Sequence, residues 1–97
     1  MTFLVELVVS LKDGLLDPQG KAVQGALPAL GWENVDQVRV GKYIRFVIDA
    51  PDRDAAMDQT HRMAERFLSN PVIEDFRVVS VAEVADDHAE QLTEDRA

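Results

Sequence analysis

The stretch "FLVELVVSL", residues 3–11, alternates large apolar side chains with a second set of residues in a strict two-residue period. Successive side chains of a β-strand point to opposite faces, so this period predicts a strand. The second face of the strand is partly apolar as well, through Leu4 and Val8. A sheet face that meets water is ordinarily polar, so the apolar side chains on this second face are more than a solvated face usually carries. The first face is apolar throughout and consists of Phe3, Val5, Leu7, Val9 and Leu11.

The stretch "LLDPQGKAVQGAL", residues 15–27, predicts the first helix. Asp17 can cap the free amides of its first turn, and Pro18 loses no hydrogen bond at the first helical position. Because Pro28 removes an interior hydrogen bond, we expect a kink or a tightened last turn there, with Gly31 as a left-handed cap. One apolar stripe at helical spacing contains Val23, Ala26, Leu27 and Leu30.

Two glycines, Gly20 and Gly25, interrupt this helix on the side away from the apolar stripe or at its margin. Each costs about 1 kcal/mol relative to alanine in a helix interior. A bare glycine face would let another backbone approach closely. Alternatively, the helix simply tolerates two weak positions, and the sequence alone does not separate these interpretations.

The stretch "VDQVRVGKYIRFVIDA", residues 35–50, predicts two strands joined by a hairpin. Val38 and Val40 alternate in the first strand, and Gly41-Lys42 supplies the expected turn. The apolar face of the second strand carries Ile44, Phe46 and Ile48.

Residues 51–71 predict the second helix, with Asp52 as its cap and Asn70-Pro71 as its end. The final strand is expected in "VIEDFRVVSVAEV", residues 72–84. The face of the second helix that we expect to pack on the sheet carries Ala56, Thr60, Met63, Ala64 and Phe67.

The resulting order, β-α-β-β-α-β, predicts an α+β protein with the ferredoxin-like arrangement: a four-stranded antiparallel sheet with two helices on one face. We expect one domain over residues 1–84. Residues 85–97, "ADDHAEQLTEDRA", form an acidic tail that is solvated or a short exposed helix. Because Leu4, Val8 and the adjacent Val78 and Val79 cannot all lie under helices, we expect a homodimer or dimer of dimers through the open face or an edge of the sheet.

Composition narrows the function classes. Ninety-seven residues, 46% of them hydrophobic, suit one compact domain. A net charge of −8 opposes binding to nucleic acid or to an anionic membrane. The absence of cysteine excludes disulfides and thiolate catalysis. Glu6 and Lys12 interrupt the apolar amino terminus, which lacks a basic leader, so we expect a cytoplasmic protein without a signal peptide or membrane span.

No reaction motif is present. The serines lie outside any nucleophile-elbow sequence, and there is no phosphate-binding or dinucleotide-binding loop. His61 and Glu65 lie one helical turn apart, but zinc sites need three or four protein ligands. We therefore expect no catalytic residue, no metal and no cofactor bound by this chain. Arg39, Lys42 and Arg45 cluster around the expected hairpin, where they either receive an acidic partner or a phosphate, or are simply solvated.

Three short motifs occur together in this order: "LDPQG" at 16–20, "VRVGK" at 38–42 and "NPVIED" at 70–75. Together they resemble the PurS family, the small subunit of the multi-chain phosphoribosylformylglycinamidine (FGAM) synthase of purine biosynthesis. The resemblance extends from Phe3 to Val84 and leaves out the acidic tail.

This resemblance implies a subunit without catalytic residues in a glutamine- and ATP-dependent ligase. In that family the glutaminase subunit PurQ releases ammonia, and the large subunit PurL uses ATP and Mg²⁺. PurS dimers join the two and assist ammonia transfer. On the first two motifs, the candidate partner contacts are Asp17, Pro18, Gln19, Gly20, Arg39, Gly41 and Lys42.

Two other functions remain open at this level. One is a free-standing ferredoxin-like regulatory domain that binds a small metabolite at a dimer interface. The other is a small enzyme with a pocket between sheet and helices. Such an enzyme would need an inward-facing histidine or carboxylate, and His61 is out of phase with the expected buried face of its helix.

Overall fold

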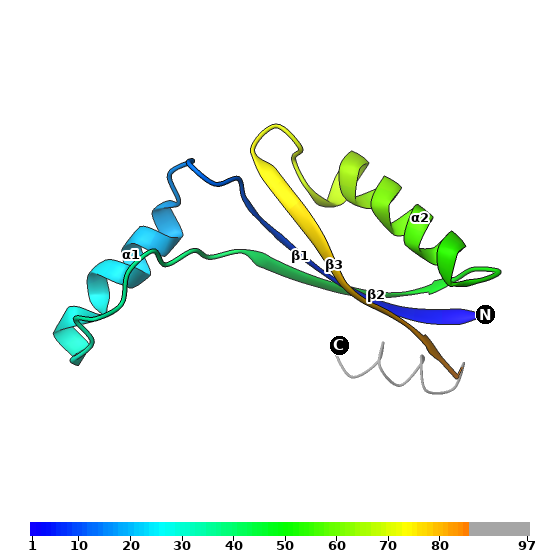
Figure 1. Ribbon diagram of the computed structural model, residues 1–97, viewed down its shortest axis with the longest axis horizontal. Helices are drawn as coiled ribbons and strands as arrows, with labels where there is room; N and C mark the ends of the chain where they lie inside the picture. Colours follow the sequence, from blue (N-terminus) through cyan, green and yellow to red (C-terminus); the bar gives the residue numbers. More distant parts are fainter. Residues whose placement is uncertain (86–97) are drawn as a thin grey trace.

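The computed structural model describes residues 1–85, and their elements form an α+β protein (Figure 1). Three antiparallel strands make one sheet in the order β2-β1-β3. The acidic tail lies outside the described residues, apart from Ala85. The strands are β1 (Thr2–Leu11), β2 (Lys42–Asp49) and β3 (Glu74–Val84). The helices are α1 (Pro18–Ala26) with the 3₁₀ turn η1 (Pro28–Leu30), and α2 (Arg53–Met63) with the π-helical turn η2 (Ala64–Leu68).

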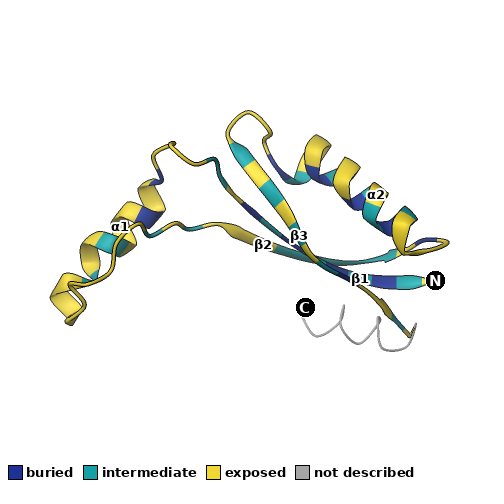
Figure 2. Cartoon of the chain, viewed as in Figure 1, coloured by how far each residue is buried: buried dark blue, intermediate teal, exposed yellow. Residues whose placement is uncertain are grey.

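β1 is the central strand, and its predicted alternation is confirmed. It pairs with β2 along one side and with β3 along the other, so Phe3, Val5, Leu7 and Val9 of its apolar face have neighbours on both sides. Figure 2 shows the buried residues concentrated along β1 and along the side of α2 that faces it. The buried residues of β1 are Phe3, Val5, Leu7 and Val9.

A β-bulge explains the adjacent valines of β3. Glu6 pairs with Ser80, whereas the next residue, Leu7, pairs with Val78, so the register shifts by one residue between them. Val79 is the extra residue and is exposed. The bulge lets Val78 and Val81 both join the core, although they lie three residues apart in the sequence.

α2 packs on the buried face of the sheet. Asp52 caps it as predicted, since the Ala55 N–H donates to its carboxylate at 2.8 Å. The Arg53 Nε donates to the Val81 carbonyl at 3.0 Å and ties the start of the helix to β3. The predicted inward residues Ala56, Thr60 and Ala64 are buried, and Met63 is half-buried.

The prediction that Phe67 packs on the sheet is wrong. Its side chain is 86% exposed, whereas the next residue, Leu68, packs against the core. The cause is the π-helical turn η2, whose hydrogen bonds join residues five apart instead of four. The Ser69 N–H, for example, donates to the Ala64 carbonyl at 2.9 Å. This wider turn moves the inward position from Phe67 to Leu68.

The four-stranded sheet and the hairpin are also wrong within residues 1–85. Residues 38–40 are extended but form no strand, and Lys42 is the first residue of β2 instead of a turn residue. The backbone amides of the segment bond to side chains in place of a neighbouring strand: Val38 N–H donates to Gln24 at 3.2 Å, and Val40 N–H donates to Asp17 at 2.8 Å.

The expectation of two helices on one sheet face holds only for α2. α1 lies beyond the end of the sheet, at the far end of a body with extents of 49 × 30 × 21 Å (Figure 1). Its apolar stripe is consequently not in the core, since Val23 and Leu30 are exposed. A chain of this length packed into one compact body would have a radius of gyration of roughly 12 Å. The observed 16.9 Å reflects the projecting α1.

The ends of α1 follow the sequence prediction. Asp17 caps the first turn and Pro18 occupies the first helical position. Pro28 tightens the end of the segment into η1, and Gly31 closes it with φ 104° while its N–H donates to the Pro28 carbonyl at 3.0 Å. No helix of the described residues is long and apolar enough to cross a membrane.

Candidate functional site

The Asp17 carboxylate connects two of the three motifs. One oxygen accepts a hydrogen bond from the Gly20 N–H at 3.0 Å, and the other accepts one from the Val40 N–H at 2.8 Å. The side chain is only 4% exposed. Asp17 therefore caps α1 and also fixes α1 to the extended segment that leads into β2. We call Asp17, Gly20, Val38, Arg39 and Val40 the Asp17 junction.

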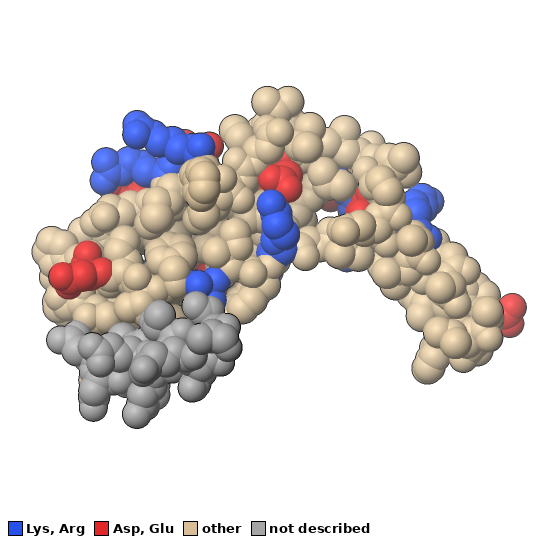
Figure 3. Space-filling model, turned by 180° about the vertical axis from the view of Figure 1, so that it is seen from behind, with Lys and Arg blue, Asp and Glu red and all other residues tan. Residues whose placement is uncertain are grey.

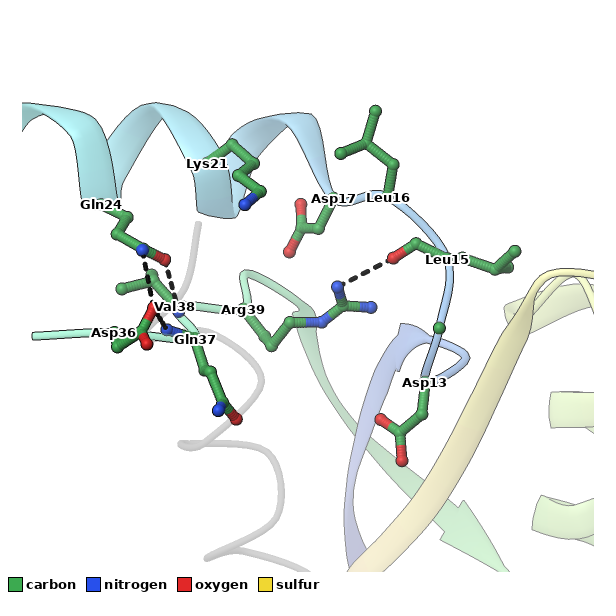
Figure 4. Close-up of a pocket in the computed structure, with 11 residues that line it drawn as sticks. Asp13, Leu15, Leu16, Asp17, Lys21, Gln24, Asp36, Gln37, Val38 and Arg39 are labelled. Carbon is green, nitrogen blue, oxygen red and sulfur yellow. Dashed lines mark hydrogen bonds between the residues drawn. The ribbon is translucent and has the colours of Figure 1, made fainter.

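Arg39 completes the junction from the opposite side. Its guanidinium donates to the Leu15 carbonyl at 2.9 Å and to the Lys12 carbonyl at 3.2 Å (Figure 4 draws the first). These carbonyls belong to the turn between β1 and α1. The arginine that the sequence assigned to a hairpin surface thus satisfies backbone acceptors of its own chain.

Gly20 is needed for close approach within the chain. A Cβ placed on Gly20 would overlap the Val38 carbonyl oxygen and would lie 2.7 Å from the Asp17 carboxylate. Gly41 is similar, because its Cβ would lie 2.7 Å from the Val9 carbonyl oxygen. Gly25, by contrast, has open space where its Cβ would be. The backbone that approaches Gly20 is that of its own chain, and the assignment of Gly20 as a partner contact stays a prediction.

The third motif meets the second at the ends of β2 and β3. Lys42 forms an ion pair with Glu74 at 3.7 Å, and the other oxygen of Glu74 accepts from the Asn70 N–H at 2.7 Å. A hollow of about 370 Å³ lies among the three motifs. It is lined by five of the seven predicted contact residues: Asp17, Pro18, Gln19, Gly41 and Lys42.

Arg39 lies on a second, larger hollow of about 660 Å³, and Gly20 is buried and lines neither hollow. Figure 4 shows this hollow between the start of α1 and residues 36–39. Gln24 on its wall was missed by the sequence analysis. Its side chain accepts from the Val38 N–H at 3.2 Å and donates to Asp36 at 2.9 Å, and no periodic pattern marks such a role.

The electrostatics of the junction suit a structural role for Asp17 better than a role in proton transfer. Two backbone hydrogen bonds, from the Gly20 N–H and to a lesser degree from the Val40 N–H, hold the pKa of Asp17 below its ordinary value of 3.8. Burial only partly opposes this. The Asp17 carboxylate is therefore ionised near neutral pH, with its oxygens engaged by backbone donors. His61 contacts the ring of Phe76 edge-on at 5.3 Å. Among residues 1–85 no group of three or more acidic or histidine side chains is arranged to hold a metal ion.

The fold and the junction define a class: a small α+β protein in which one helix covers an antiparallel sheet. A second helix projects beyond the sheet and is anchored by the Asp17 side chain. The chain belongs to the PurS family, described as phosphoribosylformylglycinamidine (FGAM) synthase, whose profile matches residues 4–82. It is accordingly a PurS-type subunit of an enzyme of purine biosynthesis.

Individual relatives agree with the family. The PurS subunit of Bacillus subtilis is 45% identical over 75 residues, which cover 77% of this chain and 88% of that one. The structure of Thermus thermophilus PurS superposes with a TM-score of 0.78 at 36% identity and covers 88% of this chain and all of that one. A chain of the PurLQS structure from Thermotoga maritima matches with a TM-score of 0.75 at 26% identity, covering 80% of this chain and 95% of that one.

The two helix glycines provide a matched pair of substitutions. Gly20→Ala is expected to lower the free energy of opening of α1, because its Cβ overlaps the Val38 carbonyl. Gly25→Ala is expected to raise it by about 1 kcal/mol, because the site is open. Amide hydrogen exchange of the α1 backbone measures both. A Gly20→Ala protein with slower α1 exchange than wild type would contradict the close approach.

The Asp17 junction is expected to weaken in acid. A carboxyl whose pKa is lowered by folding contributes stability that is present above its unfolded value and lost as the pH falls through the folded value. The Gly20 and Val40 amide signals should therefore titrate together with a midpoint below 3.8. NMR spectra recorded against pH measure this midpoint, and Asp17→Asn should abolish the shared titration. A midpoint at or above 3.8 would contradict the assigned hydrogen bonds.

Proposed function

We propose that this chain is the non-catalytic bridging subunit between the glutaminase subunit PurQ and the ATP-dependent subunit PurL, where it assists ammonia transfer. The observation that carries the proposal is the match to a chain of the Thermotoga maritima PurLQS structure over 80% of this sequence. In this proposal PurL uses ATP and Mg²⁺, and this chain supplies contact surface but no catalytic residue, metal or cofactor.

The proposed contacts with PurL or PurQ lie on the surface that the Asp17 junction supports. Pro18, Gln19, Arg39, Gly41 and Lys42 are exposed. Asp17 and Gly20 are buried and hold the backbone on which these residues sit. Because the junction is fixed by hydrogen bonds, the exposed residues are pre-organised, which lowers the entropy lost on binding.

A homodimer, or a dimer of dimers, is the proposed assembly of the chain itself. Within residues 1–85 only α2 covers the sheet, and α1 carries apolar side chains into solvent. A second copy that packs against the sheet and α1 would bury these residues. By supplying one strand and one helix, it would complete a four-stranded, two-helix layer of the ferredoxin-like kind. The exposed large apolar residues of α1 and its flanks are Leu15, Leu16, Val23, Leu30, Trp32 and Val35.

A cytoplasmic location is part of the same proposal. Purine biosynthesis uses soluble metabolites, and the net charge of −8 opposes both nucleic acid and anionic membrane surfaces as partners.

The bridging role predicts that activity appears only on mixing. This chain alone, given glutamine, ATP, Mg²⁺ and formylglycinamide ribonucleotide, should form no ADP, glutamate or amidine. Adding PurL and PurQ should give glutamine-dependent turnover, and omitting this chain from the mixture should abolish it. ADP release and amidine formation are the measurements. ATP hydrolysis by the purified chain alone would refute the proposal.

The assembly predicts a dimer or tetramer at micromolar concentration in analytical ultracentrifugation. Because apolar contacts hold it, the sedimentation coefficient should be nearly insensitive to moderate salt. Leu30→Glu should shift the protein toward monomer, whereas Val72→Glu, at a similarly exposed position away from α1, should not. A wild-type monomer at high concentration would rule out the dimer.

A further inference from the structure

The wider turn of η2 presents an aromatic side chain to solvent. The Ser69 N–H and hydroxyl both donate to the Ala64 carbonyl, at 2.9 and 2.8 Å, and close the five-residue turn. Ala64 and Ser69 are buried, so the turn is fixed from beneath. A regular helix would have placed Phe67 on the sheet. Single exposed apolar residues are common, but π-helical turns of this kind occur frequently at functional sites.

The surroundings of Phe67 have the composition of a contact surface. A shallow groove of about 400 Å³ on the outer side of α2 and η2 is lined by Phe67 together with Gln59, Arg62, Met63 and Arg66. We call these five residues the Phe67 groove. Aromatic residues, methionine and arginine are the side chains enriched at protein–protein interfaces.

Positive charge gathers on this side of an acidic protein. Figure 3 shows Lys and Arg side chains concentrated over α2, although the whole chain carries a net charge of −8. Arg62 pairs with Asp58 at 2.7 Å, one helical turn away. Within residues 1–85 the side chain of Arg66 has no hydrogen bond or ion pair. Its guanidinium remains available to a carboxylate from another molecule.

This charge argues against a second copy of the chain in the groove. A two-fold contact brings the same patch of both copies together, so the groove with Arg62 and Arg66 would lie against the same groove of the other copy. Like charges placed opposite each other oppose association. The apolar surface offered to a second copy lies instead around α1, beyond the far end of the sheet (Figure 1).

We infer that the Phe67 groove is a docking surface for another subunit of the synthase, one that presents an apolar pocket with a carboxylate rim. The Phe67 ring enters the pocket, Met63 adapts to its wall, and Arg66 pairs with the rim. This inference rests on the proposed bridging function, and it adds a second contact surface, distinct from the Asp17 junction.

Titration of the full-length chain against PurL and PurQ, separately and together, tests the inference. Phe67→Ala should weaken binding at least about tenfold, as expected for a central aromatic anchor. Arg66→Gln should weaken binding and reduce its dependence on salt. The matched controls are Val72→Ala, an exposed apolar residue outside the groove, and Arg77→Gln on β3, and both should bind as wild type does.

The outcomes separate this inference from the proposed function. Wild-type binding that Phe67→Ala leaves unchanged would overturn the groove as a docking surface and leave the bridging function standing. A wild-type chain that binds neither subunit would overturn both. Loss of the homodimer in Phe67→Ala, measured by sedimentation, would make the groove a contact between copies and would also overturn the inference.

Discussion

One carboxylate decides how this chain is arranged beyond its sheet. Asp17 accepts a backbone hydrogen bond from α1 and another from the segment before β2, and it is almost completely buried while doing so. The contact requires Gly20, because any larger residue would displace the Val38 backbone. α1 makes little apolar contact with its own sheet, so the Asp17 hydrogen bonds hold it in position. α2, by contrast, is held by packing against the core.

The sequence could predict the elements whose period reports directly on burial. β1, β3 and the caps at Asp17 and Asp52 agree with the expectations, because alternation and capping are local properties. The segment around Val38 and Val40 could not be assigned correctly from its pattern. Alternating valines look the same whether their amides bond to a neighbouring strand or to the side chains of Gln24 and Asp17. That choice depends on residues distant in the sequence.

The candidate contact residues come from motifs that the fold brings together, and their role as partner contacts stays a prediction. Arg39 and Gly20 make contacts with the backbone of their own chain. Phe67 was assigned to the core because a helical period gives no sign of a π-helical turn. Within residues 1–85 a single helix covers the small sheet, which leaves apolar surface for other molecules to cover. Membership of the PurS family gives this surplus a use, since a subunit of a multi-chain synthase functions through its surfaces.

α1 is held away from the sheet of its own chain, and one distance within the chain tests this arrangement. Because the chain contains no cysteine, Lys21→Cys and Asp54→Cys place two spin labels on exposed positions of α1 and α2 without further changes. Pulsed electron resonance on labelled chains diluted into excess wild type reports the distance within one chain. We expect a single long distance. Helices packed side by side have axes about 8–10 Å apart. A short distance between the labels, as expected for α1 packed beside α2, would contradict this arrangement.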